Sequence, residues 1–180
     1  MNHLQWMKDR FPGAESGEGP ADWNALESES GISFPEDYKA LHDHFGPFAL
    51  DDGFAVLGPA AIARVRAGDR EDLGRATGGK AGFFSGSGVG FTRLEIEGEF
   101  IYFDDLLRFG TTDVAYSLYW HTSSDDPRKW GIVVGDASRW YVFDTGITEF
   151  LVSMLSRNLS CPPLVQDDWP DENTELSPLR

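Results

Sequence analysis

The chain has 180 residues, a length that suits one domain with a sizeable core and leaves little room for two. With 41% hydrophobic and 13% aromatic residues, its composition is typical of folded globular proteins rather than disordered chains. The net charge of −15 disfavours binding to nucleic acid or an anionic membrane and favours a basic protein partner, although acidity can also serve solubility alone. The single cysteine, Cys161, excludes an intramolecular disulfide and a cysteine-rich metal site.

The amino-terminal segment, MNHLQWMKDRFPG, lacks the basic and apolar regions of a secretion signal. No window of the sequence approaches the roughly 20 apolar residues of a membrane span, so we expect a cytoplasmic protein. Leu4, Met7 and Phe11 recur at helical spacing and predict a first short helix. Asp22 is a candidate cap for a second helix, which Gly31 would end.

A third helix is predicted within residues 31–48, GISFPEDYKALHDHFGPF. Ser33 and Glu36 have the spacing of a capping box, and Pro35 lies in the first turn, where a missing N–H costs little. Gly46 can end the helix. Its apolar residues recur at steps of four, three and four and form one stripe: Phe34, Tyr38, Leu41 and Phe45.

Strand patterns dominate the rest of the chain. FAVLGP from Phe54 predicts a strand, and AAIARVRAG predicts a short helix after it. Further strands are expected in TRLEIEGEFIYF, which forms a hairpin turning at Glu97 and Gly98, and in VAYSLYW, WGIVVG and RWYVFD. VAYSLYW alternates and places one set of residues on one face: Val114, Tyr116, Leu118 and Trp120.

ITEFLVSMLSRN predicts a closing helix, with Thr145 as a candidate cap. Helices followed by strands indicate an α+β fold, with an antiparallel or mixed sheet of about five to six strands and the C-terminal helix packed on it. The last segment, 161–180, has four prolines, five acids and no period. We therefore expect a single domain over residues 1–160 and an extended or disordered acidic tail over residues 161–180.

Motifs for catalysis are weak in this sequence. GRATGGKA, from Gly74, approaches a phosphate-binding loop but has Ala81 where a Ser or Thr is required, and GSGVG, from Gly86, lacks the full dinucleotide spacing. No serine lies in a nucleophile-elbow motif, and the histidines do not have metal-ligand spacing: His3, His42, His44 and His121. We therefore expect a non-enzyme with no metal and no cofactor.

Two segments carry a resemblance to a known family. The pattern of an acid-bearing helix, a glycine, an apolar residue, then Pro, two acids and Tyr, and later a glycine is matched by Glu27, Gly31, Phe34, Pro35, Glu36, Asp37, Tyr38 and Gly46. An aromatic-plus-leucine helix near the end is matched by Glu149, Phe150 and Leu151. In these residues the chain is similar to the SUKH superfamily, which includes immunity proteins of bacterial polymorphic toxin systems and a fungal regulator of cell-wall synthesis. The segment 68–98 matches nothing in that pattern.

The resemblance implies a SUKH-like fold and a protein that binds and neutralises a cognate toxin. Such toxins are often nucleases with basic clefts, which an acidic surface can occlude. The acid doublets lie at the ends of predicted elements and, with two tryptophans, are our candidates for partner binding: Asp51, Asp52, Asp104, Asp105, Trp120, Asp125, Asp126 and Trp130. Core packing is the competing expectation for each tryptophan.

Two alternatives remain at this point. The chain could be a non-catalytic regulatory scaffold that docks endogenous proteins through a disordered tail, or a small hydrolase with a cleft of convergent ionisable groups. In either binding role we expect a monomer or weak dimer whose partner is a basic protein, not nucleic acid or a membrane.

Overall fold

The computed structural model describes residues 2–17, 19–76, 83–84, 90–91, 93–96, 98–114, 116–135, 139–166 and 168–179. The α+β class predicted from the sequence is confirmed, because the described residues form an antiparallel sheet with helices packed on it, and three of the helices precede the first strand. The described helices are α1 (His3–Arg10), α2 (Trp23–Ser30), α3 (Glu36–Phe45), α4 (Pro59–Ala76) and α5 (Ile147–Leu155). Helix α4 is longer than predicted and continues to Ala76. The loops predicted at 77–81 and 85–89 lie outside the described residues.

The described strands form one seven-stranded antiparallel sheet in the order β10-β9-β8-β7-β2-β1-β11, plus two separate hairpins. The sheet strands are β1 (Phe48–Leu50), β2 (Phe54–Val56), β7 (Leu106–Thr112), β8 (Ser117–His121), β9 (Gly131–Gly135), β10 (Trp140–Phe143) and β11 (Leu176–Pro178). The hairpin strands are β5 (Arg93–Ile96), β6 (Glu99–Tyr102), β3 (Phe83–Phe84) and β4 (Gly90–Phe91). The sequence patterns located β2, β5, β6, β8, β9 and β10 but missed β1, β3, β4, β7 and β11.

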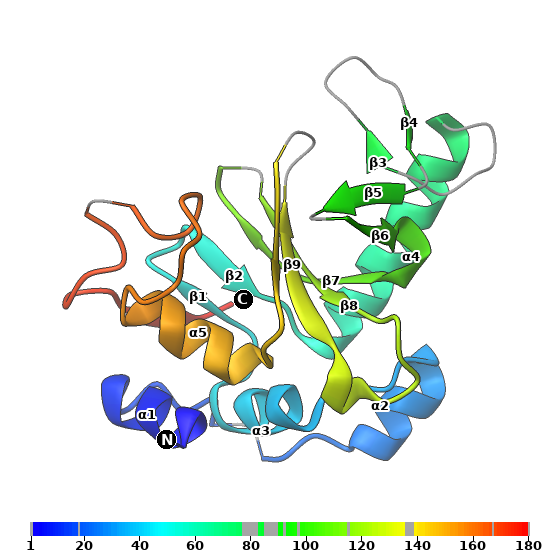
Figure 1. Cartoon of the computed structure of the whole chain (residues 1–180). Coiled ribbons are helices and arrows are strands. Elements are labelled where there is room, and N and C mark those ends of the chain that lie inside the picture. Colours follow the sequence, from blue (N-terminus) through cyan, green and yellow to red (C-terminus); the bar gives the residue numbers. More distant parts are fainter. Residues whose placement is uncertain are drawn as a thin grey trace.

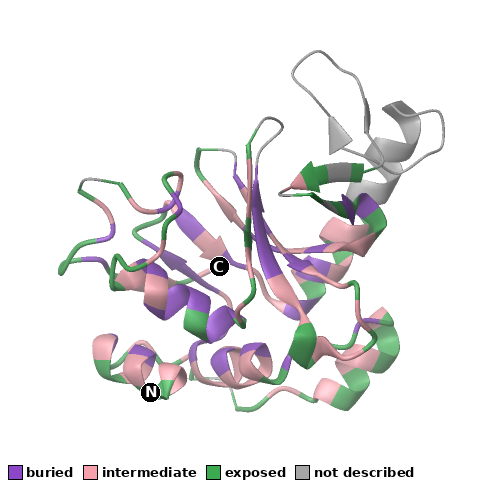
Figure 2. Cartoon of the chain, in the orientation of Figure 1, coloured by how far each residue is buried: buried purple, intermediate pink, exposed green. Residues whose placement is uncertain are grey.

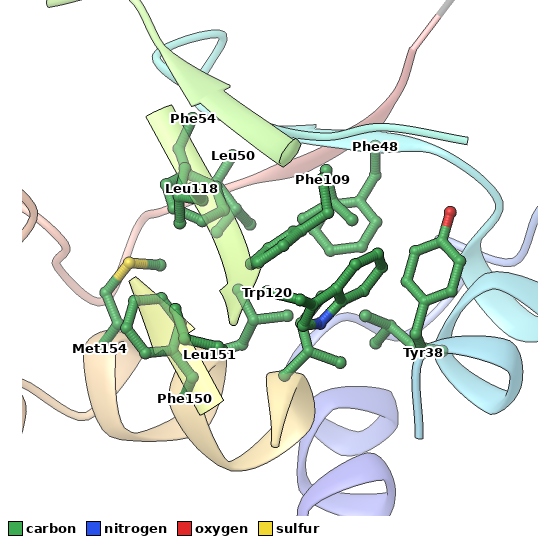
Figure 3. Packing of buried hydrophobic residues seen from close by; sticks show 14 of the residues in the cluster. Tyr38, Phe48, Leu50, Phe54, Phe109, Leu118, Trp120, Phe150, Leu151 and Met154 are labelled. Atoms are coloured by element: carbon green, nitrogen blue, oxygen red, sulfur yellow. The ribbon is translucent and has the colours of Figure 1, made fainter. Parts of the chain in front are cut away.

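The main core lies between the sheet and the helices α1, α3 and α5, which pack together on one face (Figure 1). Leu118 and Trp120 of β8 point into this core, opposite Phe109 of the neighbouring strand, and α5 contributes Phe150 and Leu151 (Figure 3). Burial is concentrated on the inner sides of the sheet strands and of α5, and the outer sides are mixed (Figure 2). The alternation predicted for VAYSLYW is therefore confirmed for Tyr116, Leu118 and Trp120 but not for Val114, which is 54% exposed and precedes the strand.

The capping box predicted for α3 does not form, since the cap position is Pro35 and makes no side-chain hydrogen bond. Glu27 of α2 takes that place: its Oε1 accepts the Phe34 N–H at 2.8 Å and lies 2.9 Å from Lys39 Nζ. Burial opposes the charge on Glu27, but these two interactions outweigh it and hold its pKa below the ordinary value. The Glu27 side chain of α2 therefore links α2 both to α3 and to the segment between the two helices.

Other residues of the family-like pattern also have structural roles. Gly31 ends α2 with a left-handed φ of 64°, and Gly46 ends α3 with a φ of 66°. The Tyr38 hydroxyl donates to the Leu57 carbonyl at 2.6 Å, and burial raises its pKa well above the usual value. Phe150 is fully buried, with its ring 5.3 Å from that of Phe143. These residues hold the helices against the sheet.

The helix caps were predicted with mixed success. Asp22 caps α2 as expected, because its side chain accepts the Ala25 N–H at 3.1 Å. Thr145 does not cap α5, which begins after Gly146 without a side-chain cap of its own. Asp37 of α3 fulfils that function across the core by accepting the Thr148 N–H at 3.2 Å.

The C-terminal segment is packed against the domain, so the expectation of an extended or disordered tail after residue 160 was wrong. Cys161 and Leu164 are each 1% exposed and belong to the main core. Strand β11 pairs with β1 over the register Phe48↔Pro178 to Leu50↔Leu176 and forms an edge of the sheet. The domain therefore extends well beyond residue 160.

Candidate partner-binding site

The structure separates the predicted partner-binding residues into three places. Trp120 lies in the core with 1% exposure, its ring 4.6 Å from Phe109 and 5.0 Å from Tyr38. Its assignment to a binding surface was therefore wrong, because inward-facing positions of β8 alternate and Trp120 follows Leu118 by two residues. The remaining residues lie at the two opposite ends of the sheet, as the register of β7 with its neighbours shows.

One end holds both later acid doublets together with Trp130. Asp104 and Asp105 lie in the 3-10 helix η1 (Phe103–Asp105), and Asp125 and Asp126 lie in the loop after β8. Asp104, Asp125 and Trp130 border one cavity of about 240 Å³, whose lining also includes Arg66. Trp130 is half-buried, and its indole N–H donates to the Ser124 carbonyl at 2.6 Å.

This end carries charges of both signs. Arg128 donates to both carboxylate oxygens of Asp126, at 2.9 and 3.0 Å. The hydrogen bond from the Arg128 side chain holds the pKa of Asp126 below its ordinary value. Because Arg66, Arg128 and Lys129 lie among the four acids, this end offers little net attraction to a cation.

The other end begins with the turn between β1 and β2. Asp51 and Asp52 adopt left-handed backbone conformations there, with φ of 49° and 58°, which aspartate tolerates better than most residues. The Asp51 carboxylate accepts the Trp169 indole N–H and the Glu175 N–H, each at 2.8 Å. Asp51 therefore fastens the C-terminal segment, and the Asp52 carboxylate remains exposed.

A cavity of about 250 Å³ opens beside this turn, and we call it the acidic cavity. Its carboxylates come from Asp51 and from Asp113, which follows β7, and its apolar walls include Val114, Leu164 and Trp169. No basic residue is among the described residues that line it. The acidic cavity therefore combines a negative rim with a partly apolar interior.

Asp113 is the free charge of the acidic cavity. Its carboxylate lies over Gly53, where an added Cβ would stand 3.6 Å from Oδ1. Among the described residues this carboxylate has no hydrogen-bond or ion-pair partner, whereas the Asp113 N–H donates to the Gly53 carbonyl at 3.0 Å. Beside it, the apolar side chain of Val114 is 54% exposed. Asp113 and Val114 therefore present one negative charge next to solvent-exposed apolar surface.

The sequence patterns missed Asp113 and Trp169 as site residues. Asp113 follows a strand that was not predicted, so nothing in the sequence placed it beside Asp51. One sequence signal could have indicated that residues 161–180 are ordered: Trp169 is a large aromatic residue of the kind that disordered segments lack.

Other groups that could support chemistry have different environments. Burial raises the pKa of the Cys161 thiol to about 12, against a smaller lowering by a hydrogen bond from the Leu164 backbone, so the thiol is protonated at neutral pH. Within the described ranges, no three side chains of His, Cys, Asp or Glu come together as metal ligands would.

No family model matches the chain, and no curated protein matches it. Over the part of the chain that the structure describes, no helix is both long and apolar enough to cross a membrane.

Proposed function

We propose that this protein is an immunity protein that binds a basic toxin of the nuclease type and blocks its active cleft. The observation that carries the proposal is the acidic cavity, in which the Asp113 carboxylate, without a partner among the described residues, stands beside exposed apolar surface. The resemblance to the SUKH superfamily supplies the class of partner, and the cavity supplies a surface suited to it.

The chemistry of the acidic cavity suits the side chain of an arginine or lysine. The aliphatic part of such a side chain would pack on Val114 and Trp169, and its charge would lie near Asp113. The net charge of −15 adds long-range attraction that speeds the encounter with a cationic partner. A nuclease cleft is rich in such cations because its substrate is a polyphosphate.

The experiment uses the partner that co-purifies from the native host and compares two double variants. Asp52→Asn with Asp113→Asn removes the Asp113 carboxylate of the acidic cavity and the exposed carboxylate of the adjacent turn while keeping the Asp51 contacts to the C-terminal segment, and Asp104→Asn with Asp105→Asn removes the same charge from the other end of the sheet. We expect the first variant to weaken binding by about tenfold or more and the second to change it by less than about threefold.

The same measurement is repeated over a series of salt concentrations. Because exposed charges are screened over about 10 Å at 0.1 M salt, we expect affinity to fall as salt rises and the fall to be shallower for the cavity variant. If the two double variants weakened binding equally, the loss of affinity would be explained by net charge alone and not by the acidic cavity. Affinity that does not respond to salt or to either variant would contradict the proposal.

A further inference from the structure

Strand β10 forms one outer edge of the seven-stranded sheet and pairs only with β9 among the described strands. In an antiparallel ladder, alternate residues direct their N–H and C=O groups away from the paired strand. Over residues 141–143 the main chain makes no hydrogen bond to a described segment other than β9. This edge can therefore accept a further strand. The inference drawn from it concerns a surface different from the acidic cavity and does not depend on the proposed function.

The β10 edge is accessible to a partner. None of its four residues is buried, whereas β9 beside it is buried at four of five positions (Figure 2). The apolar side chain of Val142 is 42% exposed. The hairpin strand β5 lies near β10, but among the described strands it pairs with β6 alone and leaves this edge without a ladder.

The two edges of the sheet differ in how they resist pairing with another chain. Proteins protect exposed edge strands with proline, charged residues or bulges. At the opposite edge, β11 is three residues long and ends in Pro178. Strand β10 consists of Trp, Tyr, Val and Phe, which are all favoured in strands, and its register with β9 is regular. It therefore has neither proline, charge nor bulge to oppose an added strand.

The charges at this edge favour a basic occupant. Asp144 directly follows β10 and is exposed, and its carboxylate has no hydrogen-bond or ion-pair partner among the described residues. Opposite charges on paired strands stabilise the pair, and like charges directly opposite each other destabilise it. A second copy of this chain would bring another net charge of −15 to the edge, whereas a basic segment would be attracted to it.

We propose that β10 binds an extended segment of a partner protein, which adds one strand to this edge of the sheet. In this mode of recognition, main-chain hydrogen bonds supply affinity and side chains at alternate positions supply specificity. The segment places an apolar residue opposite Val142 and a basic residue opposite Asp144.

The probe is the capped peptide Lys-Thr-Val-Thr-Val-Thr, which in antiparallel orientation sets its lysine opposite Asp144 and its first valine opposite Val142. Binding to the full chain is measured by calorimetry, and the backbone amides are followed by ¹⁵N NMR. We expect saturable binding that shifts the amide signals of residues 140–143. Two control peptides carry N-methyl groups on alternate residues, one peptide for each set. Because one set of N–H groups must face β10, at least one of these peptides should lose binding.

Two protein variants and one further peptide test the side-chain contacts. Val142→Lys places a cation opposite the first valine of the probe and beside its lysine, and it should weaken binding by about threefold or more. Val114→Lys makes the same change at a position that is 54% exposed beside the acidic cavity, and it should leave binding unchanged. A peptide with glutamate in place of lysine should bind the unaltered protein more weakly than the probe.

Four results would overturn the proposal. They are absence of probe binding, full binding of both N-methylated peptides, equal affinity in the two lysine variants, and equal binding of the glutamate peptide. A concentration-dependent dimer of the free chain that Val142→Lys abolishes would also overturn it, in favour of a second copy at this edge. If Val142→Lys does not fold, Asp144→Lys carries the test, since it reverses an exposed charge, and unchanged affinity for the probe there would exclude the site.

Discussion

The packed C-terminal segment can be tested by a single truncation, Leu164→Ala. Leu164 is 1% exposed and belongs to the main core, so its replacement removes buried apolar volume. Buried Leu→Ala changes cost about 2–5 kcal/mol. Leu164 also lines the acidic cavity, so part of the vacated space would join an existing opening rather than form a closed void. We therefore expect a loss of about 2–3 kcal/mol in the free energy of unfolding.

The assay is urea unfolding followed by tryptophan fluorescence, with the slope of the transition compared between variants. An unchanged slope would show that stability alone has changed. For a chain of this size, such a loss lowers the melting temperature by about 4–12 °C. The matched control is Val114→Ala, which trims the same cavity at a side chain that is 54% exposed and should cost less than about 0.5 kcal/mol. A Leu164→Ala protein as stable as this control would refute the packing of the segment.

Three further outcomes follow from the structure. Gly110→Ala should destabilise the protein by about 1–3 kcal/mol in thermal unfolding, because its Cβ would lie 2.6 Å from the Ala55 carbonyl oxygen, whereas Gly53→Ala meets only ordinary contacts and serves as its control. Glu27→Gln should lower the free energy of unfolding at neutral pH. Because the pKa of Glu27 is lowered in the folded state, its contribution is present above its ordinary pKa and is lost as pH falls through the lowered value, so urea titrations of the two proteins should converge in acid. Cys161 should react with a thiol reagent at pH 8 only as fast as the protein unfolds, and rapid reaction of the native protein would contradict its burial.

Elements with a strong local pattern were predictable from the sequence. The apolar stripe of α3 and that of α5 fix which face of each helix is buried, and the alternation around Leu118 fixes the inner face of β8. Trp120 was wrongly assigned to a partner-binding surface because that assignment followed the expected function and not the alternation. The pattern alone, read through to its last residue, predicts that Trp120 is buried.

The missed strands lack such a local signal. Strand β1 has three residues and is buried throughout, so it shows no alternation. In β7 the register shifts between Arg108 and Gly110, which interrupts the period of two. Strand β11 contains Pro178 at the edge of the sheet, a position where proline is tolerated but not diagnostic. Strand β11 is fixed by pairing with the distant β1, and β7 pairs with the distant β2 as well as with its neighbour β8.

The acidic cavity could not be assembled from the sequence for the same reason. Asp51 and Asp113 come from turns that meet only because β2 pairs with β7. Trp169 reaches Asp51 over a separation of 118 residues. Charge doublets were visible in the sequence, but their partners were not. In the structure, Asp51 accepts hydrogen bonds from the C-terminal segment, whereas the carboxylate of Asp113, which belongs to no doublet, has no partner in the part of the chain that is described.

The ordered C-terminal segment also bears on how the protein can bind partners. A scaffold that captures partners by folding of a disordered tail requires that tail to be free before contact. Here Asp51 accepts two hydrogen bonds from the segment, Arg10 donates to three of its carbonyls, and β11 completes the sheet. Releasing it would expose Leu164 and remove a wall of the acidic cavity. A partner that used the free segment would thus have to offset the loss of core packing first, whereas a partner that used the acidic cavity would meet a surface already formed.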